Sequence, residues 1–199
     1  MIVSNESAVK RFDQRQVFNA DFVYQLPFFK AQNGLVGHTL GGWQFSGIIS
    51  VNSGHWLDPA ESDGADPGGI GLNTGILANT VRPNQVGNPN SGAPHSGDVN
   101  STWFNTGAYE VAPSSQITPG DAKKNSILGP GQQNWDISLM KNIKVYEQSS
   151  FQFRLETFNT FNHTSYAGVD ATVNDGSTYG TVLSAHQPRI VQLGLKFNF

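Results

Sequence analysis

The stretch that decides the fold is Arg189-Ile190-Val191-Gln192-Leu193-Gly194-Leu195-Lys196-Phe197-Asn198-Phe199. Successive side chains of a β-strand point to opposite faces of the sheet, so one face of this stretch is wholly apolar and the other is polar or small. A strand that spans a bilayer needs roughly 9–11 residues of such alternation, often with aromatic residues at its ends. The stretch predicts either a bilayer-spanning strand or an amphipathic edge strand of a soluble β-sandwich.

The composition fits both possibilities. Charged residues make up 14% of the chain, whereas about a quarter is usual in soluble domains. The polarity comes from uncharged side chains, which suits a barrel wall around a wet lumen. A net charge of -3 gives no electrostatic case for nucleic acid as a partner. The absence of cysteine excludes a disulfide framework and thiolate metal sites.

Four earlier stretches show the same alternation of apolar and polar residues. Together with the C-terminal stretch they predict strands near 13–27, 41–53, 132–144, 149–160 and 188–199, with long loops at 54–131 and 162–187. After Thr157 the alternation slips, because Phe158 and Phe161 are apolar out of register, which predicts a bulge or the strand end. The expected fold class is all-β, with antiparallel up-and-down strands in one partial barrel domain over 1–199.

The lengths of the connections distinguish the two fold possibilities. If the chain ends on the periplasmic side, the alternating strand directions put loops 54–131 and 162–187 outside the cell. The connections 28–40 and 145–148 are then periplasmic, and they are shorter. Outer-membrane barrels have long outer loops and short periplasmic turns, whereas a soluble sandwich has no reason to sort its loops in this way. The sequence therefore favours a barrel in the outer membrane of a Gram-negative-type bacterium.

Several segments, in the same order along the chain, carry a family resemblance. They are Arg15–Asn19, Tyr24–Phe28, Gly42–Ile48, Arg82–Asn84, Leu128–Gly131, Asn134–Asp136, Phe153–His163 and the terminal strand. Together they resemble the C-terminal barrel of TonB-dependent receptors, specifically the Oar-like kind with an N-terminal carboxypeptidase-regulatory-like domain. Phe153–His163 is the most specific of these segments.

The resemblance implies a barrel of about 22 strands with an internal plug, which moves large substrates with energy passed on by TonB. About five strands are predicted here, without plug, TonB-contacting box or signal peptide, so we expect the chain to be the C-terminal part of a longer receptor. The implied partners are outer-membrane lipid, the rest of the receptor and, through the missing N-terminal part, TonB. The barrel assembly machinery would read the C-terminal strand through Gly194, Leu195, Phe197 and Phe199.

The alternation assigns residues to the two sides of the barrel wall. The expected bilayer-facing residues are Phe18, Phe22, Tyr24, Trp43, Phe45, Ile49, Ile137, Leu139, Phe151, Phe153, Leu193, Leu195 and Phe197. The expected lumen-facing residues are Gln44, Asp136, Arg154, Glu156, Gln192 and Lys196. Two carboxylates can carry acid–base chemistry. Asp136, Arg154 and Glu156 fit a polar network of the lumen better, so we expect no enzyme.

The long loop holds the candidate ligand-binding residues Trp56, Trp103, Phe104 and Tyr109. Aromatic side chains beside Asn and Asp suit capture of carbohydrate or peptide, and the alternative is internal packing of the loop. Asp58, Glu61, Asp63 and Asp66 resemble a calcium loop weakly, but their spacing is wrong for an EF-hand. The histidines show no metal-ligand spacing. We expect no metal and no cofactor.

Two alternatives to the receptor remain open at this point. A secreted β-sandwich binding module would use the loop aromatics as its platform, and its apolar faces would pair into a buried core. A self-contained barrel could also form by oligomerisation, if each copy contributes a few strands.

Overall fold

The computed structural model describes residues 13–61, 81–98, 101–113, 115–116, 118–146 and 149–199. The chain forms two compact units. The sheet unit consists of Gln16–Asn52, Gln132–Thr164 and Gln187–Phe199. The loop unit contains the described parts of Met1–Arg15, Ser53–Gly131 and Ser165–His186. Among the described residues, no helix is long and apolar enough to cross a membrane.

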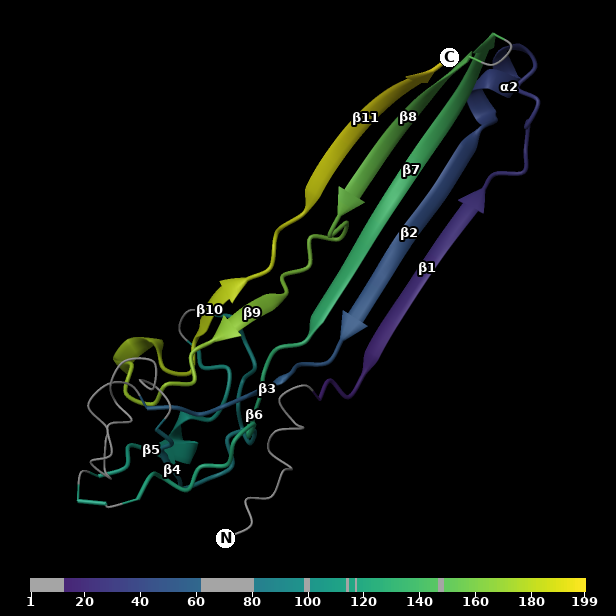
Figure 1. Cartoon of the computed structure of the whole chain (residues 1–199). Helices are drawn as coiled ribbons and strands as arrows, with labels where there is room; N and C mark the ends of the chain where they lie inside the picture. The colour runs from purple at the N-terminus through teal and green to yellow at the C-terminus, as the bar shows by residue number, and fades with distance from the viewer. Residues whose placement is uncertain (1–12, 62–80, 99–100, 114, 117, 147–148) are drawn as a thin grey trace. The chain divides into compact units, whose positions relative to one another are not determined.

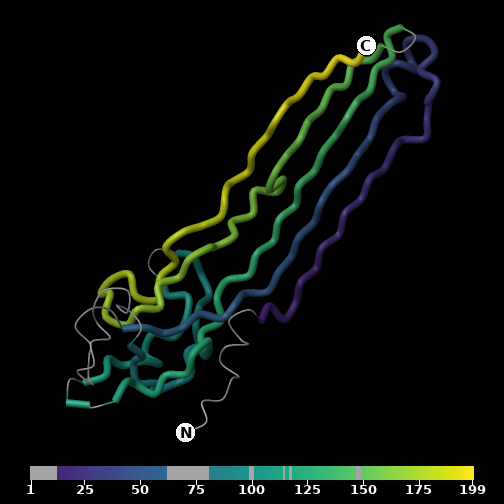
Figure 2. Tube along the Cα trace, viewed as in Figure 1, coloured from purple at the N-terminus to yellow at the C-terminus, as the bar shows by residue number. Residues whose placement is uncertain are grey.

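The sheet unit is one antiparallel sheet of five strands (Figures 1 and 2). The strands are β1 (Val17–Gln25), β2 (Trp43–Asn52), β7 (Gln132–Tyr146), β8 (Ser149–Phe158) and β11 (Ile190–Asn198). Their order in the sheet, β1-β2-β7-β8-β11, follows their order in the chain. This is the up-and-down arrangement that the alternating pattern predicts. Strand β8 stops at Phe158, so the slip in alternation marks a strand end.

The strand register sorts side chains onto two faces of opposite character. One cross-strand row runs Tyr24, Phe45, Leu139, Leu155 and Leu193. The row on the other face, one residue along, runs Val23, Ser46, Ser138, Glu156 and Gln192. The apolar face is open, since Leu193 is 67% and Leu195 is 72% exposed. An apolar face that remains open is the arrangement of a barrel wall in lipid, not of a sandwich with a closed core.

The sequence predicts a plain connection from β1 to β2, but part of this connection is helical. It forms the short helix α2 (Gly34–Leu40). Just before it, Gln32 is buried and bonds the overhanging end of β7: its Nε2 donates to Asn142 O at 2.7 Å, and its Oε1 accepts from Lys144 N at 2.9 Å. Strand β7 extends past Lys141, where its pairing with β2 ends. The Gln32 amide supplies hydrogen bonds to this end of β7, which is unpaired on the β2 side.

The loop unit has its own small core instead of being an extended surface loop. Three two-stranded sheets pair β3 (Trp56–Leu57) with β6 (Ile127–Leu128), β4 (Asn84–Gln85) with β5 (Tyr109–Glu110), and β9 (Tyr166–Val169) with β10 (Val182–Ala185). The described part of the unit also contains two 3-10 turns, η2 (Thr106–Ala108) and η3 (Gly176–Thr178). Residues from both long connections pack around the same cluster. The two connections therefore fold as one body.

Candidate functional site

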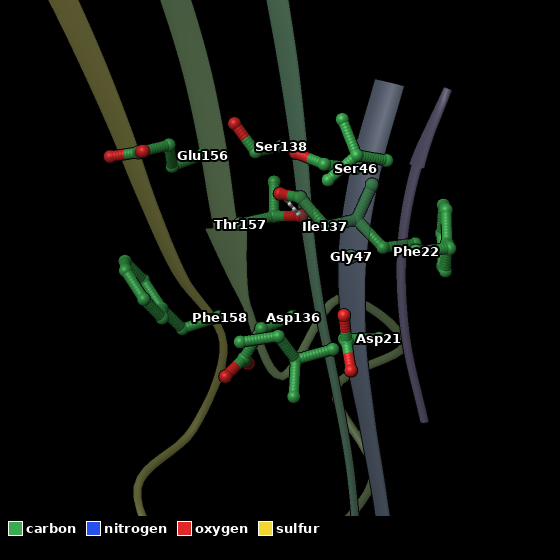
Figure 3. A pocket seen from close by; sticks show the side chains of 12 residues that line it. Asp21, Phe22, Ser46, Gly47, Asp136, Ile137, Ser138, Glu156, Thr157 and Phe158 are labelled. Carbon is green, nitrogen blue, oxygen red and sulfur yellow. Dashed lines mark hydrogen bonds between the residues drawn. The ribbon is translucent and has the colours of Figure 1, made fainter. Parts of the chain in front are cut away.

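The polar face of the sheet carries a shallow pocket of about 360 Å³. Four neighbouring strands, β1, β2, β7 and β8, supply its lining: Asp21, Phe22, Val23, Ser46, Gly47, Ile48, Asp136, Ile137, Ser138, Glu156, Thr157 and Phe158. Figure 3 shows Ser46, Ser138 and Glu156 side by side across the strands, as their register requires. The pocket therefore lies where the two-face pattern predicts the lumen.

Three carboxylates, those of Asp21, Asp136 and Glu156, line the pocket. Arg154 lies beside Glu156, with 3.5 Å between Nη1 and Oε1, and its Nη2 also donates to Gln152 at 3.3 Å. Asp136 makes a different contact, because its Oδ1 accepts the backbone N–H of Asn159 at 3.0 Å. Of the predicted polar network, the structure thus joins Arg154 to Glu156 and uses Asp136 to hold a turn. An ion pair this open to water contributes little to stability.

The turn that follows β8 is built by Asn159, a residue that the alternation pattern does not single out. Its φ is +49°, a left-handed conformation that asparagine tolerates better than most residues. The side chain is 9% exposed and makes three hydrogen bonds. Its Nδ2 donates to His163 O at 3.0 Å and to Gln187 O at 3.3 Å, and its Oδ1 accepts from His163 N at 2.9 Å.

Neighbouring residues tie the same turn to the strands on both sides. The hydroxyl of Thr160 donates to Trp135 O in β7 at 2.8 Å. The Oδ1 of Asn162 accepts the N–H of Arg189, just before β11, at 3.0 Å. The segment Phe158–His163, called the β8 turn from here on, therefore fixes three strands relative to one another. In the sequence, the signal for this turn is the pair of asparagines, Asn159 and Asn162. Both adopt a positive φ, which asparagine tolerates better than most residues.

Three of the four aromatic candidates in the loop unit are core residues. Trp103 is 8%, Phe104 0% and Tyr109 4% exposed. The indole of Trp103 donates to Leu128 O at 2.9 Å, and the hydroxyl of Tyr109 lies 2.6 Å from that of Ser126. Trp56 is half-buried, with the Arg15 guanidinium 5.5 Å from its ring centre. These positions favour internal packing over a ligand platform.

The C-terminal strand lies at one edge of the sheet. Leu195 and Phe197 lie on its apolar face, and Phe199 is 96% exposed. Phe197 packs on Phe151 of β8 with ring centres 4.8 Å apart. Gly194 lies on the opposite face, across from Arg154. The four residues of the predicted assembly signal are thus accessible along one edge strand.

Asp58 and Glu61, the two described residues of the calcium-loop pattern, bind backbone groups. The Oδ1 of Asp58 accepts from Asn125 N at 2.5 Å, and the Oε1 of Glu61 accepts from Ala112 N at 2.6 Å. Asp63 and Asp66 lie outside the described residues. The described residues contain no group of three or more His, Cys, Asp or Glu placed to hold a metal ion.

We expect Glu61 to make the loop unit less stable as the pH rises. Its side chain is fully buried, and its Oε2 has no hydrogen-bond partner among the described residues. Burial raises the pKa of the Glu61 carboxyl above its ordinary value of 4.5, although the Ala112 N–H opposes this. The folded unit then holds the proton more tightly than the unfolded chain does, so stability falls as pH rises from 4.5 through the folded pKa.

Glu61→Gln should remove this pH dependence and stabilise the unit at neutral pH by roughly 1–3 kcal/mol. The measurement is amide hydrogen exchange of the segment around Ala112 in the full-length protein, corrected for intrinsic rates, between about pH 5 and pH 8. Glu110→Gln is the matched control, since Glu110 is exposed. Equal pH dependence in wild type and Glu61→Gln would contradict the assignment.

Comparison with known proteins agrees with the architecture. A profile of the family described as "Outer membrane beta barrel domain" matches residues 3–192. No curated protein and no solved structure matches the chain. The matched region spans β1, β2, β7, β8 and both long connections, and it ends within β11. The family places the protein in the outer membrane, where one face of its sheet meets lipid and the other the lumen. The chain therefore belongs to the outer membrane beta barrel domain family.

Proposed function

We propose that the chain forms the C-terminal part of the barrel wall of a TonB-dependent outer-membrane receptor of the Oar-like kind. Its loop unit forms part of the extracellular, substrate-facing surface. The strand register carries this proposal, because it separates an open apolar face from a polar face with a pocket. The segment that most specifically resembles these receptors, Phe153–His163, includes the β8 turn that holds three strands together.

The described sheet needs further strands to make a barrel. Strands β1 and β11 are its two edges, and each pairs with one neighbour. A closed barrel needs at least about eight strands. In the proposed receptor, the rest of the same polypeptide supplies the missing strands and the plug, and TonB acts through that plug. The C-terminal strand, with Phe199 exposed, presents an open edge to the barrel assembly machinery.

The proposed role is transport and not catalysis. Two carboxylates on the polar face make structural contacts: Glu156 pairs with Arg154, and Asp136 accepts a hydrogen bond from the backbone of the β8 turn. A charged, water-filled lumen accommodates such groups without a reaction.

A barrel assembled from several copies of the chain is the second candidate. The two open edges, β1 and β11, favour it, because edge strands pair readily with further strands. The secreted β-sandwich does not fit, since it requires the apolar face to be covered, and Leu195 on that face is 72% exposed.

Electrophoresis of isolated outer membranes, with an antibody against the loop unit, tests these candidates. A receptor predicts a denatured band much heavier than 21.5 kDa that also yields plug peptides by mass spectrometry. An oligomeric barrel predicts a 21.5 kDa band after boiling and a heavier band before it. A 21.5 kDa species recovered from the culture medium would contradict both.

A second experiment tests the dependence on TonB. Compounds removed from the growth medium by the wild type are compared with those removed by a strain that lacks this gene and by a strain that lacks TonB. The proposal predicts at least one compound that is removed by the wild type alone. If the strain without TonB removes the same compounds as the wild type, the TonB-dependent part of the proposal is wrong.

A further inference from the structure

Helix α2 turns its apolar side outward. At about 100° per residue, Leu35, Val36 and Leu40 fall within one arc, and they are 87%, 59% and 50% exposed. The buried residue of the helix is Gly37, where an added Cβ would collide with the backbone of Gln32. A helix on a protein in water shows the opposite arrangement, with its apolar stripe packed against the core. The helix is therefore built for apolar surroundings.

The residues before the helix extend this apolar surface. Phe28 is 62% and Phe29 is 51% exposed, and they lie in the same connection between β1 and β2. Exposed apolar residues gathered in this way mark a site of contact with a protein or a membrane.

The C-terminal end of α2 is fixed to the apolar face of the sheet. Trp43 and Lys141 pair across β2 and β7 on that face. The indole Nε1 of Trp43 donates to Thr39 O at 2.9 Å. The Nζ of Lys141 donates to Thr39 O at 3.0 Å and also to Gly41 O, and it lies 5.0 Å from the centre of the Trp43 ring. The apolar side of α2 thus continues the face that meets lipid.

These contacts also explain how a lysine can occupy the apolar face. Lys141 is 5% exposed, so its ammonium is covered by the carbonyl groups at the end of α2 and by the Trp43 ring. A cation is stabilised near the C-terminus of a helix and over an aromatic ring. The charge is thereby kept away from acyl chains at the rim of the apolar face.

We propose that α2, with Phe28 and Phe29, is an interfacial anchor that lies in the periplasmic leaflet of the outer membrane. Its apolar side enters the acyl chains, and His38, which lies about 160° around the helix from Val36 and Leu40, points toward the headgroups. Residues 26–47 contain Lys30 and His38 but no acidic residue, which suits a surface of phosphate headgroups. The anchor rests on the proposed barrel wall, because the wall sets the depth of the helix in the membrane.

Depth-dependent quenching tests the anchor in the full-length protein in isolated outer membranes. The chain has no cysteine, so single variants can carry one environment-sensitive fluorophore. The variants are Val36→Cys and Leu40→Cys on the apolar side of α2, and His38→Cys, about 160° around the helix from both, as the matched control. The quenchers are stearates with a nitroxide either near the headgroup or near the methyl end. Leu195→Cys reports the apolar face itself.

The expected result is that the shallow nitroxide quenches Val36→Cys and Leu40→Cys about threefold or more above His38→Cys, and more strongly than the deep nitroxide does. Quenching of Val36→Cys and Leu40→Cys no greater than that of His38→Cys, with Leu195→Cys quenched, would overturn the anchor and leave the wall intact. An unquenched Leu195→Cys would overturn the barrel wall and the anchor with it.

Discussion

Replacing Asn159 with alanine is expected to destabilise the sheet by about 2–4 kcal/mol. The substitution removes the three side-chain hydrogen bonds to His163 and Gln187. It also puts alanine at a φ of +49°, where a Cβ is unfavourable. The measurement is urea unfolding of the full-length protein in phospholipid vesicles, followed by loss of the folded band on unheated gels.

Two further variants separate the effect of the lost hydrogen bonds from that of the unfavourable φ. Asn159→Gly relieves the backbone but not the lost hydrogen bonds, so it should be more stable than the alanine variant by about 1 kcal/mol. Asn33→Ala is the matched control, because Asn33 is exposed and its side chain makes no capping bond to α2; its effect should stay within about 0.5 kcal/mol. A wild-type unfolding midpoint for Asn159→Ala would show that these bonds do not hold the turn.

The strands could be predicted from the sequence because their signal is local. Alternation of apolar and polar residues has a period of two, and it defines both the strand and its faces. β1, β2, β8 and β11 lie within their predicted ranges, and β7 extends its range to Tyr146. The two faces of the sheet could be predicted from the same alternation. The register places Leu139, Leu155 and Leu193 in one row, on the side that the alternation assigns to lipid.

The loop unit could not be predicted, because its core is not local. Phe104 and Ile127 of the first long connection pack with Tyr179 and Val182 of the second, and these residues show no regular spacing in the sequence. Their burial depends on which distant segments meet. Exposed aromatics in a loop and packed aromatics in a small core therefore have the same appearance in the sequence, and burial distinguishes them.

Helix α2 and the contacts of Asp136 were missed for different reasons. Gly34 and Gly37 are poor helix formers, and the N-cap Asn33 makes no side-chain bond, so the usual signals of a helix start are weak. The partner of Asp136 depends on how β8 ends. The left-handed turn at Asn159 brings that residue's N–H to the carboxylate, a contact that alternation alone cannot indicate.

Placing an arginine at Leu195 is expected to be the most damaging surface substitution on the sheet. Leu195 is 72% exposed, and in a soluble protein a charge at such a position would be nearly neutral. On the lipid face of a barrel it costs about 2–4 kcal/mol near the bilayer midplane, because the guanidinium loses its hydration. The free energy of unfolding of Leu195→Arg in phospholipid vesicles, compared with that of Leu195→Ala, measures this cost without the loss of the leucine.

Matched positions on the same strand show whether lipid is the cause. Gln192 lies on the polar face opposite Glu156, so Gln192→Arg should change stability by less than about 0.5 kcal/mol. Near the end of β11, the cost of Phe197→Arg relative to Phe197→Ala should fall to about 0–1 kcal/mol, since penalties decrease toward the interface. A cost that is equal at Leu195 and Phe197 would point to burial against protein instead of a bilayer, and would contradict the wall.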